Sequence, residues 1–115
     1  MWFCGTGTLG HTPYTRSLCF QVQFVVLSDD PEYCRRTLVG PDVIHVEGNH
    51  PVVDLAIASL CDHAVITLGT FGWWAAWFAG GLTITQANFP NWKQGSNVAN
   101  NMRREDYYKP DWIAL

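Results

Sequence analysis

Gly69, Thr70, Phe71 and Gly72 have the residue types and spacing to bind a phosphate group. They follow the apolar segment 64–68, which is typical of a buried strand, and they open a second apolar segment that is long enough for a helix. The first N–H groups of a helix lack partners within the helix, and the helix dipole favours an anion at that end. We therefore expect this turn to hold a diphosphate; the alternative is that Thr70 only caps the helix.

Carboxylates stand at two further positions of interest. Asp29 follows the apolar run 20–27, at the carboxyl end of an expected strand, where ligands of open α/β sheets gather. A simple turn-and-cap role is the alternative for Asp29. Asp54 is expected to be the N-cap of a helix. Asp62 and His63 precede the amino end of a strand, so we expect them to be structural, and His50 is a minor candidate on the opposite, carboxyl side.

The elements that must position these residues alternate between strand and helix, which is typical of parallel βα units. Met1 to Leu18 has no clear period and is expected to be irregular, while the apolar tail from Tyr107 is expected to pack back on the body. The fold class predicted is α/β, with a short parallel sheet and flanking helices. The expected strands lie at 20–27, 43–46, 64–68 and 82–86, and the expected helices at 31–38, 54–61 and 71–80.

Four aromatic residues dominate the last expected helix. Trp73, Trp74, Trp77 and Phe78 fall on one broad helical face, which predicts that they pack in the core against the sheet. The alternative is that one tryptophan borders a bound sugar. Thr67, in the strand before this helix, is expected to point into the core.

Composition excludes several function classes. The net charge is −3 with only seven basic residues, so no nucleic-acid-binding footprint is present. The start of the chain has no basic, apolar signal sequence, and the apolar run 71–81 is too short to cross a bilayer, which takes roughly 20 residues. The motif Gly5-Thr-Gly-Thr-Leu-Gly10 imitates a dinucleotide fingerprint, but it lacks the preceding strand and the following helix.

Four cysteines, Cys4, Cys19, Cys34 and Cys61, show no CxxC spacing, which argues against a zinc site. We expect them to be free, buried thiols. Pairing in an oxidising compartment is the alternative.

The central segments resemble the galactoside 2-alpha-L-fucosyltransferase family, glycosyltransferase family 11, over about residues 24–115. Residues 24–34 resemble its "SDDPEWC" segment, and residues 54–81 resemble its long "SLCDH…ITxGTFGWWAAWLAGG" block. Residues 87–90 match its "ANFP" turn, and residues 106–113 are similar to its closing "YxPxWIGI".

The resemblance implies the donor-binding, C-terminal Rossmann-like half of a GT-B-type enzyme that moves fucose from GDP-fucose to the 2-hydroxyl of a terminal galactose on a glycan. It implies that Asp54 holds the guanine base, that residues 69–72 contact the diphosphate, and that Asp29 belongs to the donor site. It also implies an inverting reaction without a metal ion or other cofactor. A Golgi membrane location, facing the lumen, is the further implication, through an anchor that this chain does not contain.

The chain departs from the family pattern in one important respect. The arginine-rich HxRRxD stretch, which the resemblance places against the donor phosphates, does not occur; the two Arg-Arg pairs begin at Arg35 and Arg103 in other contexts. We therefore expect two parts, an irregular segment 1–19 without family resemblance and a partial fucosyltransferase domain at 20–115. The chain then looks like a truncated copy of the enzyme, the alternative being a non-catalytic nucleotide-sugar-binding or scaffold fragment.

Overall fold

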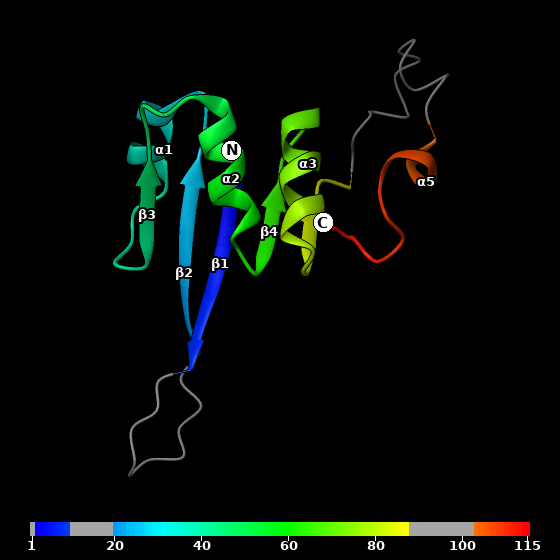
Figure 1. The fold of residues 1–115 in the computed structure, drawn as a ribbon, viewed down its shortest axis with the longest axis horizontal. Helices are drawn as coiled ribbons and strands as arrows, with labels where there is room; N and C mark the ends of the chain where they lie inside the picture. The colour runs from blue at the N-terminus through cyan, green and yellow to red at the C-terminus, as the bar shows by residue number, and fades with distance from the viewer. Residues whose placement is uncertain (1, 10–19, 88–102) are drawn as a thin grey trace.

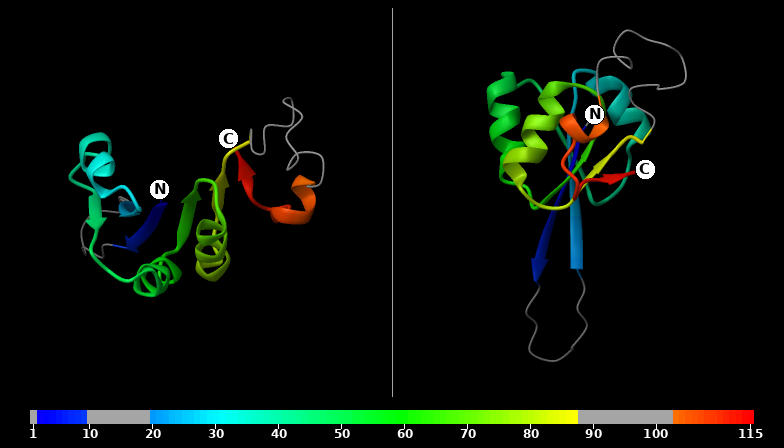
Figure 2. Two further views of the ribbon diagram at one scale, coloured as in Figure 1. Left: turned by 90° about the horizontal axis from the view of Figure 1, so that it is seen from above. Right: turned by 90° about the vertical axis from the view of Figure 1, so that its right-hand side faces the viewer.

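The computed structural model describes residues 2–9, 20–87 and 103–115. Six strands form one sheet, with α1 on one face and α2 and α3 side by side on the other (Figures 1 and 2). The strands are β1 (Trp2–Leu9), β2 (Phe20–Leu27), β3 (Val43–Val46), β4 (His63–Ile66), β5 (Thr83–Thr85) and β6 (Ile113–Ala114). The helices are α1 (Pro31–Thr37), α2 (Pro51–Ser59), α3 (Thr70–Ala79) and α5 (Arg104–Tyr107).

The sheet has the strand order β3-β2-β1-β4-β5-β6. The strand β1 pairs antiparallel with both β2 and β4, whereas β2–β3, β4–β5 and β5–β6 pair in parallel. All strands except β1 therefore run the same way, and their carboxyl ends meet at one edge of the sheet. The predicted α/β class, with short parallel pairing and flanking helices, is confirmed.

Strand β1 is the main difference from the sequence prediction. The irregular conformation expected for residues 1–18 is wrong for Trp2–Leu9, which pairs residue by residue with β2, from Trp2 opposite Leu27 to Leu9 opposite Phe20. Its glycines and threonines show no apolar alternation, so the local pattern does not reveal a strand. The strand forms because neighbours on both sides supply hydrogen-bonding partners, and such context dominates β-propensity.

The helix starts follow from proline and cap residues. Asp30 caps α1 as expected, since its carboxylate accepts a hydrogen bond from the Tyr33 N–H at 3.0 Å. Helix α2 begins earlier than predicted, at Pro51, and its N-cap is His50 rather than Asp54. A proline is favoured at the first helical position because its φ angle is already helical and its missing N–H is not needed there.

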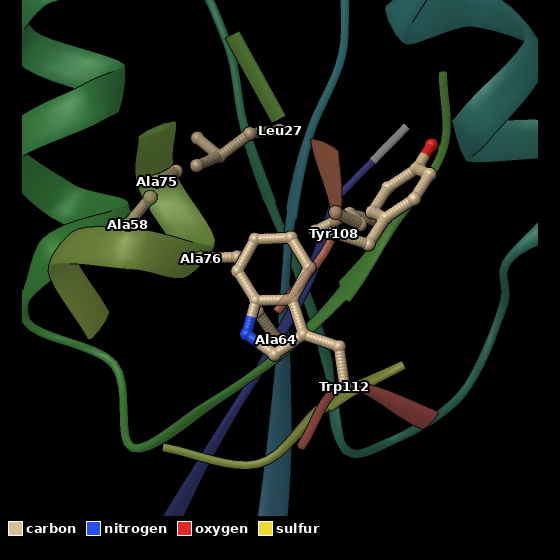
Figure 3. Close-up of a cluster of buried hydrophobic side chains, with 8 residues drawn as sticks. Leu27, Ala58, Ala64, Ala75, Ala76, Tyr108 and Trp112 are labelled. Carbon is tan, nitrogen blue, oxygen red and sulfur yellow. The ribbon is translucent and has the colours of Figure 1, made fainter. Parts of the chain in front are cut away.

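The core lies between the sheet and the α2–α3 layer, as Figure 3 shows. Alanines on both helices let the backbones come close to the sheet, and two aromatic residues of the C-terminal tail complete the cluster, as predicted for the tail. The tail also extends the sheet, because the Leu115 N–H donates to the Thr85 carbonyl at 2.9 Å. The buried residues of this cluster are Leu27, Ala58, Ala64, Ile66, Ala75, Ala76, Tyr108 and Trp112.

The predicted core packing of the α3 aromatic face is wrong for three residues. Trp74, Trp77 and Phe78 are exposed, whereas Ala75 and Ala76 are buried against the sheet. Large apolar side chains favour burial, but a helix this close to a sheet has room only for small residues at the contact. Helix α3 therefore turns an aromatic surface outward.

Two cysteines have assigned states. Cys61 is disulfide-bonded, so the expectation of free thiols is wrong for this residue, whereas Cys34 is a free, buried thiol as expected. Among the described helices, none is long and apolar enough to cross a membrane.

Candidate functional site

A pocket of about 390 Å³ opens at the carboxyl edge of the sheet, between the ends of β2 and β4. Its walls come from the loop after β2, the loop after β3 with the first turn of α2, and the loop after β4 with the first turn of α3. This is the edge at which open α/β sheets bind ligands. The lining residues are Leu27, Ser28, Asp29, Asn49, Pro51, Asp54, Thr67, Leu68, Phe71 and Gly72.

Four of the six site residues proposed from sequence line this pocket: Asp29, Asp54, Phe71 and Gly72. Asp54 lies in the first turn of α2 and is half-buried, and its Oδ1 accepts a hydrogen bond from the Asn49 Nδ2 at 3.3 Å. The amide thus orients the carboxylate while leaving its second oxygen for another donor. A carboxylate is acceptor-only when ionised, so this wall of the pocket suits a ligand with adjacent N–H donors.

Asp29 lines the pocket from the turn between β2 and α1. The turn is closed by a hydrogen bond from the Asp30 N–H to the Ser28 hydroxyl at 3.0 Å. Asp29 is exposed, so its carboxylate is open to solvent and to a ligand at the pocket mouth. The pocket therefore has carboxylate acceptors on two walls.

The start of α3 forms the third wall. Its N-cap is Gly69, with φ 113° and ψ 158°, and no side chain caps the helix there. That backbone conformation is essentially restricted to glycine. The first turn of α3 lies at the positive end of the helix dipole, which favours negative charge beside it.

The remaining two proposed residues sit beside the pocket rather than in its lining. Gly69 forms the turn at which α3 begins, and Thr70 lines a second, smaller pocket on α3. Thr70 is not the cap of α3, because Gly69 occupies the N-cap position.

Several other expectations can be compared with the structure. The expectation that Thr67 points into the core is wrong. Thr67 is exposed and lines the pocket, because β4 ends one residue before it. His63 is structural as expected, its Nδ1 accepting a hydrogen bond from the Leu82 N–H at 3.1 Å. His50 caps α2 through a hydrogen bond from the Val52 N–H to its Nδ1 at 3.3 Å.

Asn49 was missed by sequence reasoning. It lies in the loop that follows β3, and the rule that ligands gather at the carboxyl ends of parallel strands would have identified it.

The second pocket has a volume of about 210 Å³ and is lined by Thr70, Trp73, Trp74, Asp106 and Tyr107. The Trp73 and Trp74 rings stand nearly perpendicular, at 83°, with their centroids 5.0 Å apart. The Trp73 Nε1–H donates to the Tyr107 carbonyl at 2.5 Å, which ties α3 to α5. Burial, and secondarily the neighbouring Tyr108, raise the pKa of Tyr107 above its ordinary value of 10.0.

Within the described residues, no group of three or more histidine, cysteine, aspartate or glutamate side chains is arranged to hold a metal ion. The basic side chains near the sheet are engaged elsewhere: Arg35 forms an ion pair with Glu47, and Arg36 lies 3.7 Å from Glu32. The acceptors of the first pocket and the helix start of α3 are thus the features that a ligand there would meet.

Comparison with known proteins decides the family. Residues 15–115 match the family described as Glycosyl transferase family 11. The chain belongs to glycosyltransferase family 11. It is 37% identical over 97 residues to the galactoside 2-alpha-L-fucosyltransferase SEC1 of Bos taurus, which covers 80% of this chain and 26% of the relative.

Two further relatives extend the comparison. The galactoside 2-alpha-L-fucosyltransferase Sec1 of Mus musculus is 40% identical over 98 residues, again 80% of this chain and 26% of the relative. The galactoside alpha-(1,2)-fucosyltransferase 1 of Ateles belzebuth is 32% identical over 121 aligned positions, covering 95% of this chain and 32% of the relative. The family 11 chain thus spans about a quarter to a third of the length of these relatives, and no solved structure matches it significantly.

Proposed function

We propose that this family 11 chain carries the donor site of a galactoside 2-alpha-L-fucosyltransferase and binds GDP-fucose in the pocket between β2 and β4. The observation that carries the proposal is that Asp29, Asp54 and the uncapped start of α3 line one pocket in a member of this family. The relatives are named for transfer of fucose to a galactoside, which supports fucose as the group transferred and a galactoside as the acceptor.

The guanine base is proposed to meet Asp54. Guanine presents its N1–H and its exocyclic amine side by side, and two adjacent donors match the two oxygens of a carboxylate. Asn49 already holds one oxygen of Asp54, which limits rotation of the carboxylate before the base arrives.

The diphosphate is proposed to lie against the first turn of α3, near Gly69, Thr70, Phe71 and Gly72. The N–H groups of a helix start and the helix dipole stabilise a phosphate anion. They also stabilise the charge that grows on the leaving GDP as the bond from the fucose anomeric carbon to the phosphate oxygen breaks and the bond to the galactose 2-oxygen forms. Asp29 is proposed to accept from ribose hydroxyls, as the acidic residue of dinucleotide folds does.

The strand order supports a Rossmann-like relationship. The order 3-2-1-4-5-6 is that of doubly wound nucleotide-binding sheets, in which the ligand sits where the order reverses, between strands 1 and 4. The pocket lies near that point of the sheet, between the carboxyl ends of β2 and β4. The antiparallel β1 departs from this pattern, and assignment to the donor half of a GT-B-type enzyme rests on the strand order together with the family.

The alternative proposal is that this segment binds the nucleotide sugar, or acts as a scaffold, without catalysing transfer. The first reading predicts binding with transfer, and the second predicts binding without it.

Calorimetry with GDP, GDP-fucose and ADP tests the donor site. We expect GDP and GDP-fucose to bind and ADP to bind more weakly, with no effect of a metal chelator. Asp54→Asn should weaken GDP binding by about tenfold or more, because the amide NH2 places a donor against one of the two guanine N–H groups and a lost charge-assisted bond is worth about 1.5–3 kcal/mol. Asp111→Asn, an exposed carboxylate outside the pocket, is the matched control.

Equal affinity for GDP and ADP, or an unchanged affinity in Asp54→Asn, would contradict the base assignment. A fucose-transfer assay with a galactose-terminated acceptor then separates the enzyme from the binding fragment.

The location proposed is the lumenal side of the Golgi membrane. The disulfide at Cys61 supports an oxidising compartment, since such bonds are rare in the cytosol. The partners proposed are GDP-fucose and a galactose-terminated glycan, without nucleic acid.

A further inference from the structure

We propose that the smaller pocket on α3, lined by Thr70, Trp73, Trp74, Asp106 and Tyr107, binds a pyranose ring of the galactoside acceptor. This inference rests on the proposed function, which supplies the galactoside, but its residues and its test are separate from those of the donor pocket. The pocket volume of about 210 Å³ is of the size of a single sugar ring rather than a nucleotide.

The walls are aromatic in the way that sugar recognition needs. A galactopyranose has one face made mainly of C–H groups, which packs on an aromatic ring, and a rim of hydroxyls that require hydrogen bonds. Trp74 is 48% exposed, although burial of an indole on a helix is strongly favourable. It stands at 83° to Trp73, so the two rings make a corner.

The corner is fixed before any ligand arrives. Trp73 stacks on Trp77 at a centroid distance of 5.0 Å and an angle of 17°, and its Nε1–H donates to the Tyr107 carbonyl. Trp74 stacks in turn on Phe78, with centroids 5.9 Å apart. Side chains that are already ordered lose little entropy when a ligand binds, so their contacts contribute more fully to affinity.

The polar groups match the rim of the sugar. Asp106 supplies a carboxylate and Thr70 a hydroxyl to an otherwise aromatic pocket. Hydrogen bonds from hydroxyls to a carboxylate are short and about twice as strong as neutral ones, so Asp106 can accept one or two sugar hydroxyls. A pocket lined by aromatic rings and the Asp106 carboxylate suits a neutral sugar better than an anion, because the carboxylate repels negative charge.

The place of the pocket relative to the donor site adds a further argument. Thr70 lines the smaller pocket, while the next two residues, Phe71 and Gly72, line the larger one. Both pockets thus border the first turn of α3. A donor whose diphosphate lies at this turn would bring its fucose close to an acceptor held in the aromatic corner, as transfer between the two requires.

Saturation-transfer NMR and tryptophan fluorescence titration with methyl β-galactoside test the inference, with calorimetry of GDP in parallel. Trp74→Ala should weaken the galactoside by about tenfold, since a stacked aromatic contact together with its buried area is worth about 1.4 kcal/mol or more. The affinity for GDP should not change. Asp106→Asn, at an exposed position, should also weaken binding of the galactoside.

Tyr33→Ala is the matched control. Tyr33 is an exposed aromatic residue on α1, 47% accessible, and outside the pocket lining. Its loss removes an exposed ring that contacts neither proposed ligand, so binding of both ligands should be retained.

Unchanged galactoside binding in Trp74→Ala and Asp106→Asn, or no galactoside binding by a chain that binds GDP, would overturn the inference and leave the donor site intact. Loss of GDP binding with retained galactoside binding would instead contradict the proposed donor site alone. Circular dichroism of each variant identifies any loss of fold, and Asp106→Asn keeps the test open if Trp74→Ala unfolds.

Discussion

The Nδ1 of His63, at the start of β4, accepts a hydrogen bond from the Leu82 N–H at 3.1 Å, just before β5 begins. This contact joins the amino ends of two neighbouring parallel strands, at the edge of the sheet opposite the candidate site. It depends on the close approach of the backbone between α3 and β5, where Gly81 lies.

Gly81→Ala is expected to destabilise the fold. A Cβ at this position would lie 1.7 Å from the Asp62 carbonyl oxygen and 2.8 Å from the His63 Nδ1, so backbone must move and the hydrogen bond from Leu82 is lost. Overpacking of this kind costs about 1–3 kcal/mol, which urea-induced unfolding measures. Gly48→Ala is the control, because its Cβ would meet nothing within 4 Å and only its positive φ of 75° adds cost.

Equal losses of stability in Gly81→Ala and Gly48→Ala would contradict the clash and leave only a general effect of adding a Cβ.

Gly69→Ala is expected to lower both stability and affinity for GDP. The Gly69 backbone, at φ 113° and ψ 158°, lies in a region that L-residues avoid, at a cost of about 1–3 kcal/mol, although there is open space for the Cβ. Relief of this strain would turn the first N–H groups of α3 away from the pocket. Thermal unfolding and GDP calorimetry measure the two effects.

Gly80→Ala provides the comparison, because Gly80 has φ 72° at the other end of the same helix. It should lose stability and keep the affinity for GDP. A Gly69→Ala variant that binds GDP normally would argue against the role of this turn.

The unfolding free energy is expected to fall as the pH rises above 10. Burial, and then the nearby Tyr108, raise the pKa of Tyr107 in the folded chain above its ordinary value of 10.0. The folded state then holds the phenolic proton more tightly than the unfolded state, so this stability is present below pH 10 and declines as the pH rises toward the folded pKa.

Tyr107→Phe should reduce this fall in unfolding free energy relative to the parent chain, because phenylalanine has no phenolic proton to lose. Urea titrations between pH 9 and 11 measure the difference. Tyr33→Phe, at an exposed position of α1, is the control. An identical pH dependence in the parent and Tyr107→Phe would refute the assignment.

Reduction is expected to destabilise the chain through Cys61. Loss of a native disulfide from a small domain costs about 2–5 kcal/mol. Thermal unfolding with and without reductant should therefore differ for the parent chain and coincide for Cys61→Ser. Alkylation of the unfolded, unreduced chain should label Cys34, which is a free thiol, but not Cys61; labelling of both would disprove the disulfide.

Much of the fold could be predicted from local patterns. The apolar run before Ser28, the Asp30-Pro31 helix start and the strand–turn–helix around Gly69 all form close to where their residues indicate. These elements carry their signals within a few residues, through period, capping and proline geometry. The division of the chain at residue 20 stays a prediction.

The misses share a physical cause, which is dependence on partners distant in sequence. Strand β1 forms because it pairs with β2 and β4, and its own glycines and threonines give no local sign of this pairing. Trp74 points outward because small residues occupy the contact between α3 and the sheet. The start of α2 could have been found, since His50-Pro51 carries the proline signal for a first helical position.

In the candidate site, sequence reasoning identified the acidic residues and the turn before α3 but not Asn49, Asp106 or Tyr107. The first follows a short strand, and the other two come from a tail more than thirty residues beyond Trp73, with which Tyr107 shares a hydrogen bond. These contacts between residues far apart in the sequence depend on the overall fold rather than on any local pattern.

The reversed strand β1 joins two blocks of the sheet, β2–β3 and β4–β5–β6. Since neighbouring strands stand about 4.8 Å apart, it acts as a spacer that holds the ends of β2 and β4 about 10 Å from each other. The turn that contains Asp29 follows β2 in one block, and the amino end of α3 follows β4 in the other. The width of the candidate pocket is consequently set by strand β1, residues 2–9, which stands between the two blocks.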